Sequence, residues 1–152
     1  MEYKLSVGFN GNLELLEKMY ADKENKIGTL YTGGYLKEIT SGRYQHSKSE
    51  QELERIVEAV HNKNARLAVT LNSPCNVPPL SEKQWWKNVK NYLKHLETIG
   101  VDTAIIAHPF IMAIAKENTH LSVATSIICD VNTPRGALYY EDMGADVIVP
   151  SS

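Results

Sequence analysis

Cysteine is scarce in this sequence, and its two positions follow no metal-binding spacing. Cys75 and Cys129 are the two cysteines among 152 residues, and neither belongs to a CxxC or a cysteine/histidine motif. The spacing excludes a zinc-finger-type site and a disulfide framework. We therefore predict two free thiols and no metal site within the chain. The alternative is that one thiol joins a metal site whose other ligands lie outside it.

Neither an excess of one charge nor a long apolar run is present. The formal net charge is -2 and the sequence pI is near 6.2, whereas nucleic-acid-binding proteins usually carry a basic excess. No run approaches the roughly 20 apolar residues that span a bilayer, and the apolar stretch near Met1 is too short for a signal peptide. We expect a soluble, cytoplasmic protein with no nucleic-acid or membrane partner.

Two common catalytic motifs are also missing. The segment Gly8–Asn12, which follows the first predicted strand, lacks the GxGxxG spacing of a dinucleotide-binding loop. Ser126 and Ser151 lie in no GxSxG motif, and the spacing suggests no aspartate–histidine pair for either. The sequence therefore argues against a nucleotide-binding loop and against a serine hydrolase.

Strands and helices alternate along the whole chain. Short apolar, β-branched runs predict six strands at residues 4–9, 27–32, 65–71, 103–107, 121–125 and 145–149. Five helical patterns separate them, at 13–20, from 49, from 81, after His108 and at 134–143. No hairpin turn joins adjacent strands, so the strands are expected to be parallel with helical crossovers.

The predicted helix ends follow known capping patterns. Asn12 suits an N-cap, and Ser49 with Glu52, like Ser81 with Gln84, matches a capping box. Gly100 and Gly144 are placed to end helices, and Pro109 occupies the first position of another.

These patterns predict an α/β fold, an incomplete (β/α) TIM-type barrel of about six parallel strands and five helices. A complete barrel of eight units needs about 250 residues. Residues 1–152 are therefore expected to be a single partial barrel domain, the N-terminal portion of a longer enzyme. The alternative is a Rossmann-like open sheet.

The order of several segments resembles the N-terminal region of the collagenase-like peptidases, family U32. The segments are 31–34, 41–43, 69–72, 100–106, 121–126 with Asn132, and 144–149. The resemblance implies a TIM-like barrel and a peptidase that binds a peptide or another small substrate. It also implies an alternative, because some members are iron–sulfur proteins that support hydroxylation of RNA bases or of a quinone precursor. The cluster-binding cysteines of those members would lie beyond Ser152, so no cofactor is expected within this chain. A third possibility is a non-catalytic binding module.

Polar residues at the predicted strand ends are the candidate site, because the carboxyl ends of barrel strands gather at one mouth. His108 can serve as a general acid or base, or it can simply cap the following helix. Asn72 can orient a substrate, or it can form an ordinary turn before Ser73. We take these two as catalytic candidates. The substrate-binding candidates are Asn10, Thr32, Arg43, Thr125, Ser126 and Ser151. Arg43 can clamp a carboxylate or phosphate, or be a solvated loop residue.

A partial barrel also has consequences for association. The first and last predicted strands, at residues 4–9 and 145–149, would expose unpaired backbone groups. We expect a homodimer, because most homo-oligomers have two-fold symmetry. In sedimentation over a concentration series, a species that stays at 17.0 kDa would contradict this expectation.

Overall fold

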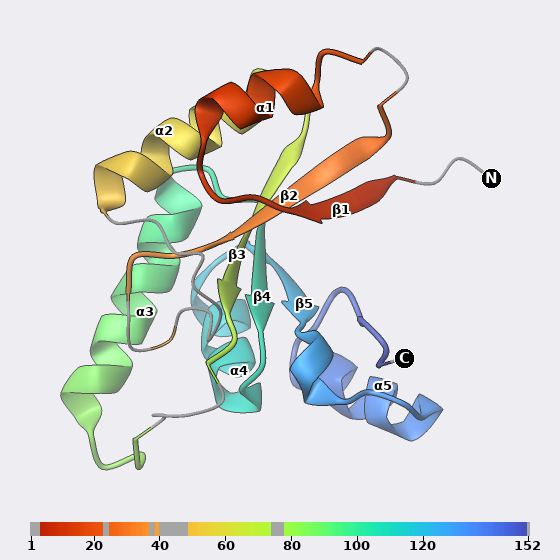
Figure 1. The fold of residues 1–152 in the computed structure, drawn as a ribbon. Coiled ribbons are helices and arrows are strands. Elements are labelled where there is room, and N and C mark those ends of the chain that lie inside the picture. Colours follow the sequence, from red (N-terminus) through yellow and green to blue (C-terminus); the bar gives the residue numbers. More distant parts are fainter. Residues whose placement is uncertain (1–3, 23–24, 37–38, 40–48, 74–77, 152) are drawn as a thin grey trace.

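The computed structural model of the chain describes residues 4–22, 25–36, 39, 49–73 and 78–151. Strands and helices alternate through these residues, as the sequence pattern predicts, and Figure 1 shows the arrangement. The elements, in chain order, are β1 (Leu5–Gly8), α1 (Leu13–Met19), β2 (Ile27–Gly33), α2 (Glu50–His61), β3 (Arg66–Leu71), α3 (Lys83–Thr98), β4 (Thr103–Ile106), α4 (Pro109–Asn118), β5 (Ser122–Thr125), the 3-10 turn η1 (Ile127–Cys129) and α5 (Pro134–Asp142).

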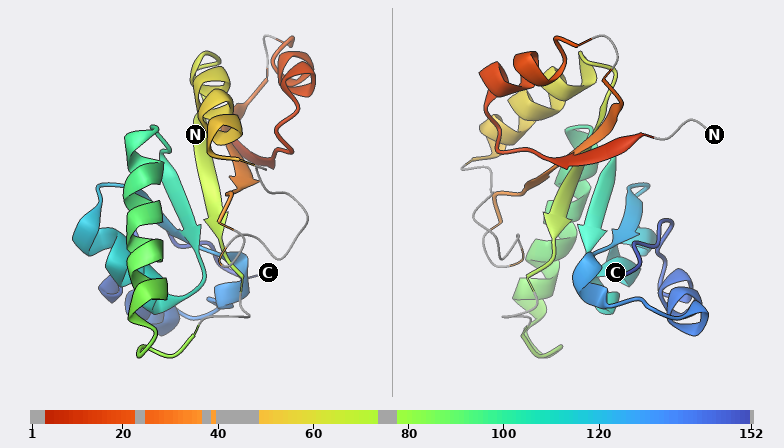
Figure 2. Two further views of the ribbon diagram at one scale, coloured as in Figure 1. Left: turned by 90° about the vertical axis from the view of Figure 1, so that its left-hand side faces the viewer. Right: turned by 45° about the vertical axis from the view of Figure 1, so that its right-hand side comes forward.

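The strands form one parallel sheet in the order β1-β2-β3-β4-β5. A doubly wound open sheet reverses its order at a switch point, whereas a barrel adds each strand beside the one before it. The sequential order therefore decides between the two predicted architectures in favour of the barrel type. The two views of Figure 2 show the sheet twisting strongly from β1 to β5.

The expected sixth strand, at residues 145–149, is not formed as a strand, so the sheet of the described residues has five strands. This segment touches the sheet through an isolated parallel bridge between Ala124 and Val147. The amide of Val149 donates to the hydroxyl of Thr125 at 2.7 Å instead of to a backbone carbonyl. The backbone ladder is interrupted there, which is the physical reason for the difference in strand count.

Most of the predicted helix ends are confirmed. Asn12 caps α1, and Ser49 accepts a hydrogen bond from the amide of Glu52 at 3.1 Å. The exception is Ser81, because α3 begins after Glu82 with no side-chain cap, and Gln84 donates instead to Asn88. A capping pattern in the sequence therefore does not guarantee that the cap forms.

The core lies between the sheet and its helices. Alternate strand residues point towards this layer, and the paired positions Val69, Ala104 and Val123 are fully buried. Helix α2 contributes Leu53, Ile56, Val57 and Val60 to the same cluster. Ile105 points to the opposite face and is only half-buried, whereas its neighbour Ile106 is completely buried. No helix in the described part of the chain is long and apolar enough to cross a membrane.

Two Gly-x-Asp sequences, which helped to carry the family resemblance, stabilise the start of the strands. Gly100 and Gly144 adopt positive φ angles of 88° and 102°, a conformation that glycine allows at a helix end. Two residues later, Asp102 accepts a hydrogen bond from the amide of Leu67 and Asp146 accepts one from that of Val123, each at 2.8 Å. Asp102 therefore ties the start of β4 to β3, and Asp146 ties the segment after α5 to β5.

Asp146 provides a pH-dependent prediction. Burial raises its pKa, but hydrogen bonds from Lys116 and from the amide of Val123 outweigh that effect and lower the pKa below its usual value. The unfolded chain then binds more protons than the folded one between the two pKa values, so this stabilisation is present above the unfolded value and is lost as the pH falls. Asp146→Ala should lower the free energy of unfolding by about 1 kcal/mol at neutral pH, since the pair is partly exposed.

Urea denaturation at pH 7 and below about pH 3 would test this, because the difference from the wild type should shrink in acid. Asp142→Ala removes a charge from the exposed surface of α5 and serves as the control. An effect of Asp146→Ala that is the same at both pH values would show that the carboxylate charge is not the cause.

Candidate functional site

Three of the predicted site residues meet at the carboxyl edge of the sheet. Asn72 directly follows β3, Ser126 follows β5, and His108 comes two residues after β4, which lies between them. The three strands are parallel neighbours, so their carboxyl ends lie side by side.

A hydrogen bond between Asn72 and Ser126 spans this edge. The side-chain amide of Asn72 donates to the hydroxyl oxygen of Ser126 at 3.1 Å, and Ser126 is only 1% exposed. The amide of Ser126 donates to the carbonyl of Ile106, which anchors the serine to the intervening strand. The side-chain oxygen of Asn72 is buried and has no hydrogen-bond partner among the described residues. Such an oxygen can accept a hydrogen bond from a bound ligand.

His108 caps helix α4 and also keeps one ring nitrogen available. Its Nδ1 accepts a hydrogen bond from the amide of Phe110 at 3.2 Å. Burial lowers the pKa of the imidazole, so the neutral form is favoured. Because Nδ1 acts as an acceptor, the proton of the neutral ring is on Nε2, which makes this atom a donor. The capping role and the site role left open by the sequence are therefore compatible.

Two pockets meet at His108. The larger, of about 450 Å³, is mainly apolar and is lined by Pro78, Pro79, Leu80, Trp86, His108 and Phe110. The smaller, of about 210 Å³, has equal polar and apolar character and is lined by Ser73, Ala107, His108, Ile128, Cys129 and Tyr140. An apolar pocket beside a few polar groups is typical of a binding site.

The thiol of Cys129 in the smaller pocket has the character of a structural cysteine. Its sulfur lies 3.6 Å and 3.5 Å from the backbone carbonyls of Ile106 and Ala107, to which it can donate. Burial raises the pKa of this thiol, which favours the protonated form over the nucleophilic thiolate. Tyr140, whose own pKa burial raises to about 12, covers it from α5.

The remaining predicted residues are placed differently. Thr32 and Thr125 are buried, and the hydroxyl of Thr125 accepts the amide of Val149. The side chain of Asn10 accepts the amide of Asn12 in the exposed turn before α1, and the amide of Ser151 donates to the carbonyl of Val131. Arg43 and Cys75 lie outside the described residues. Binding roles for these residues stay predictions.

Ser126 and Ser151 have no histidine among their hydrogen-bond partners in the described chain.

Sequence reasoning missed the walls of the pockets. Trp86 and Phe110 form an edge-to-face pair with ring centres 5.4 Å apart, and Trp86 also lies 6.2 Å from His108. The sequence did contain a signal for these walls. Phe110 follows His108 by two residues, and Pro78 and Pro79 precede the helix that carries Trp86. The contact itself joins two different helices, so the pattern of neither helix contained it.

The chain is similar to known proteins in both sequence and structure. The sequence profile of peptidase family U32 matches residues 13–152, and no curated protein sequence matches the chain. The structure of the U32 peptidase Mk0906 is similar, with a TM-score of 0.74 and 18% identity over 99% of this chain and 59% of that one. The carboxyl transferase domain of Rhizobium etli pyruvate carboxylase gives a TM-score of 0.63 at 11% identity, over 95% of this chain and 26% of that one.

A β-N-acetylhexosaminidase from Streptomyces coelicolor gives a TM-score of 0.53 at 9% identity, over 98% of this chain and 48% of that one. At such low identities the structural matches show the fold alone, which is the α/β barrel type. The chain spans 59% of the length of the U32 structure that it resembles. The profile match covers most of the sequence, and this chain therefore belongs to peptidase family U32.

Proposed function

We propose that the carboxyl edge of strands β3 to β5 binds an extended peptide, and that this chain is the substrate-binding barrel portion of a U32 family hydrolase. The observation that carries the proposal is the pairing of Asn72 with Ser126, which leaves a buried acceptor oxygen unpaired. A peptide offers a matching donor in each of its backbone N–H groups.

The two pockets that His108 lines, at the carboxyl end of the neighbouring strand β4, suit the rest of a peptide. The apolar pocket between Trp86 and Phe110 can take a large apolar side chain. The Nε2–H of His108, at the junction of the two pockets, can donate to a peptide carbonyl. Bond cleavage is not assigned to any of these residues, because a protonated thiol and a serine without a histidine partner are poor nucleophiles.

Binding of a capped Leu-Phe dipeptide would test the proposal. Trp85→Phe leaves Trp86 as the one tryptophan of the chain, so that its fluorescence reports on the apolar pocket. In this background Phe110→Ser should weaken binding by about tenfold or more, because it removes an apolar wall of the pocket. Asn72→Leu should also weaken it, because leucine has a similar size but no oxygen that can accept a hydrogen bond from a peptide N–H group.

Leu138→Ser is the matched control, because Leu138 is also an exposed apolar residue on a helix but lines neither pocket. It should leave the affinity unchanged. Equal effects of Phe110→Ser and Leu138→Ser, or saturable binding whose affinity is unchanged by Asn72→Leu, would contradict the proposed site.

Two other functions are alternatives to peptide binding by a hydrolase: a hydroxylation role and a non-catalytic binding module. A hydroxylation role needs an iron–sulfur cluster held by several cysteines, and Cys129 by itself does not fit such a cluster. A non-catalytic binding module would bind the same peptide without cleaving it, so mass spectrometry of the peptide after incubation with the longer protein, of which this chain is proposed to be a portion, separates the module from a hydrolase.

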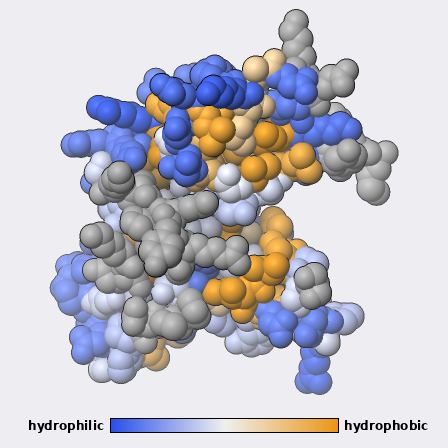
Figure 3. Space-filling model, viewed as in Figure 1, coloured by the Kyte–Doolittle hydropathy of each residue, from blue (hydrophilic) through white to orange (hydrophobic). Residues whose placement is uncertain are grey.

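Self-association also stays a proposal. Figure 3 shows apolar side chains on both sides of a hollow between β1 and the C-terminal part of the chain. Leu5 on the edge strand β1 and Val147 beside β5 are about half exposed, at 48% and 47%. A second copy that covers such apolar surface would bury it in a two-fold arrangement.

A further inference from the structure

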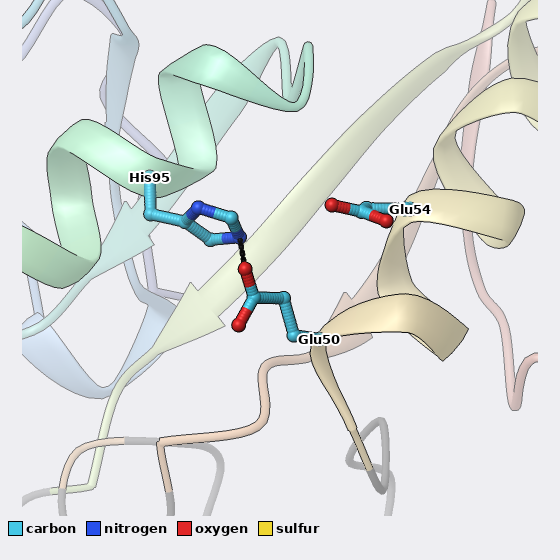
Figure 4. Close-up of side chains that lie close together, drawn as sticks. All are labelled: Glu50, Glu54 and His95. Carbon is cyan, nitrogen blue, oxygen red and sulfur yellow. Dashed lines mark ion pairs between the residues drawn. The ribbon is translucent and has the colours of Figure 1, made fainter.

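A second cluster of ligand-type side chains lies between helices α2 and α3 and shares no residue with the peptide site. It consists of Glu50, Glu54 and His95, whose potential ligand atoms all lie within 4.8 Å of one another. Figure 4 shows the two carboxylates and the imidazole converging from the two helices. We propose that these three residues bind one divalent transition-metal ion, with Zn²⁺ as the representative ion.

The local geometry favours a shared ion. Glu50 and Glu54 are four residues apart on α2, so their side chains lie on one face of the helix. The Nε2 atom of His95 is buried and lies 3.0 Å from Oε1 of Glu50, an ion-pair distance at which the angles of a hydrogen bond are not met. Zinc–ligand bonds are about 2.0 to 2.2 Å, so two ligands of one ion lie about 3 to 3.5 Å apart. The separation therefore fits two members of one coordination sphere.

The electrostatics of the cluster also favour a cation. Glu50 lies in the first turn of α2, where the helix dipole stabilises a negative charge, but Glu54 lies one turn further on. Glu54 has no ion-pair partner in the described part of the chain. Burial, followed by the negative charges of Glu50 and Glu54, raises the pKa of Tyr35 to about 12. A bound cation would neutralise this excess negative charge.

The donor set selects the class of ion. One imidazole nitrogen with two carboxylates suits Zn²⁺, Mn²⁺ or Fe²⁺, whereas Mg²⁺ and Ca²⁺ prefer oxygen ligands throughout. Three protein ligands leave at least one position for water. The ion would connect the N-terminal part of α2, which carries Glu50 and Glu54, to the last turn of α3, which carries His95. It would thereby stabilise the contact between the two helices.

Calorimetric titration of the chelator-treated chain with Zn²⁺ tests the proposal. We expect one Zn²⁺ per chain, no competition from Mg²⁺, and at least tenfold weaker binding by Glu54→Gln, since the loss of even a supporting contact to a metal ligand costs about 10- to 100-fold. Glu58→Gln removes the same charge from an exposed position one turn further along α2 and should bind as the wild type does. Equal affinities for the two variants, or no binding by the wild type at millimolar Zn²⁺, would overturn the proposal and leave only a histidine–glutamate ion pair.

Nitrogen chemical shifts of the histidines provide a second readout that does not depend on mutation. Zn²⁺ should shift Nε2 of His95 and leave the ring nitrogens of His61, His108 and His120 unchanged. A shift at one of those three residues in place of His95 would place the ion elsewhere and overturn the assignment.

Discussion

Leu71→Ala is expected to lower the free energy of unfolding by about 2 to 5 kcal/mol, whereas His108→Ala should lower it by about 1 kcal/mol. The side chain of Leu71 is 2% exposed and belongs to the core between sheet and helices, so its removal leaves a cavity. His108 is partly exposed, and its replacement removes one capping hydrogen bond to Phe110. Chemical denaturation of both variants measures the two losses.

Two further variants make this comparison sharper. Ile106→Ala should resemble Leu71→Ala, because Ile106 is also completely buried on the helix-facing side of the sheet. Leu138→Ala, which truncates a leucine that is 59% exposed, should cost less than about 0.5 kcal/mol. If His108→Ala proved as destabilising as Leu71→Ala, the imidazole would be a core residue and would lose its place in the proposed peptide site.

Gly34→Ala is expected to destabilise the protein by about 1 to 3 kcal/mol through overpacking. A methyl group at Gly34 would lie 1.7 Å from the hydroxyl oxygen of Tyr92 and 3.0 Å from the ring carbon that bears it. Tyr92 cannot easily move away, because it is 5% exposed on α3 and packs edge-to-face on Tyr35 with ring centres 4.9 Å apart.

A double-mutant cycle isolates the cause of this destabilisation. In a Tyr92→Phe background the hydroxyl is absent, so the cost of Gly34→Ala should fall by about 1 kcal/mol or more. Gly136→Ala, whose new methyl group would meet nothing closer than 3.2 Å, should cost less than Gly34→Ala. An equal cost of Gly34→Ala in the presence and absence of the Tyr92 hydroxyl would show that the strain arises from another contact.

Local physical rules explain how much of the site could be predicted. Asn72 and His108 were found because polar residues stand out where an apolar strand ends, and parallel strands end at one edge. The partnership of Asn72 with Ser126 joins residues 54 positions apart, so no local pattern contained it. The same holds for the cluster of Glu50, Glu54 and His95, because a helix pattern shows which residues share a face and not which face of another helix they meet.

The sequence by itself determined the alternation of strands and helices, the parallel sheet and most helix ends. Apolar periodicity, capping side chains and left-handed glycines act within a few residues, so they can be recognised without a fold. Tertiary structure alone decided the strand order, the missing cap at Ser81 and the incomplete pairing of residues 145–149. These features depend on competition between hydrogen-bond partners that are distant in sequence. The amide of Val149 shows this competition, because it bonds to the side chain of Thr125 and thereby leaves the backbone ladder that its own β-branched sequence favours.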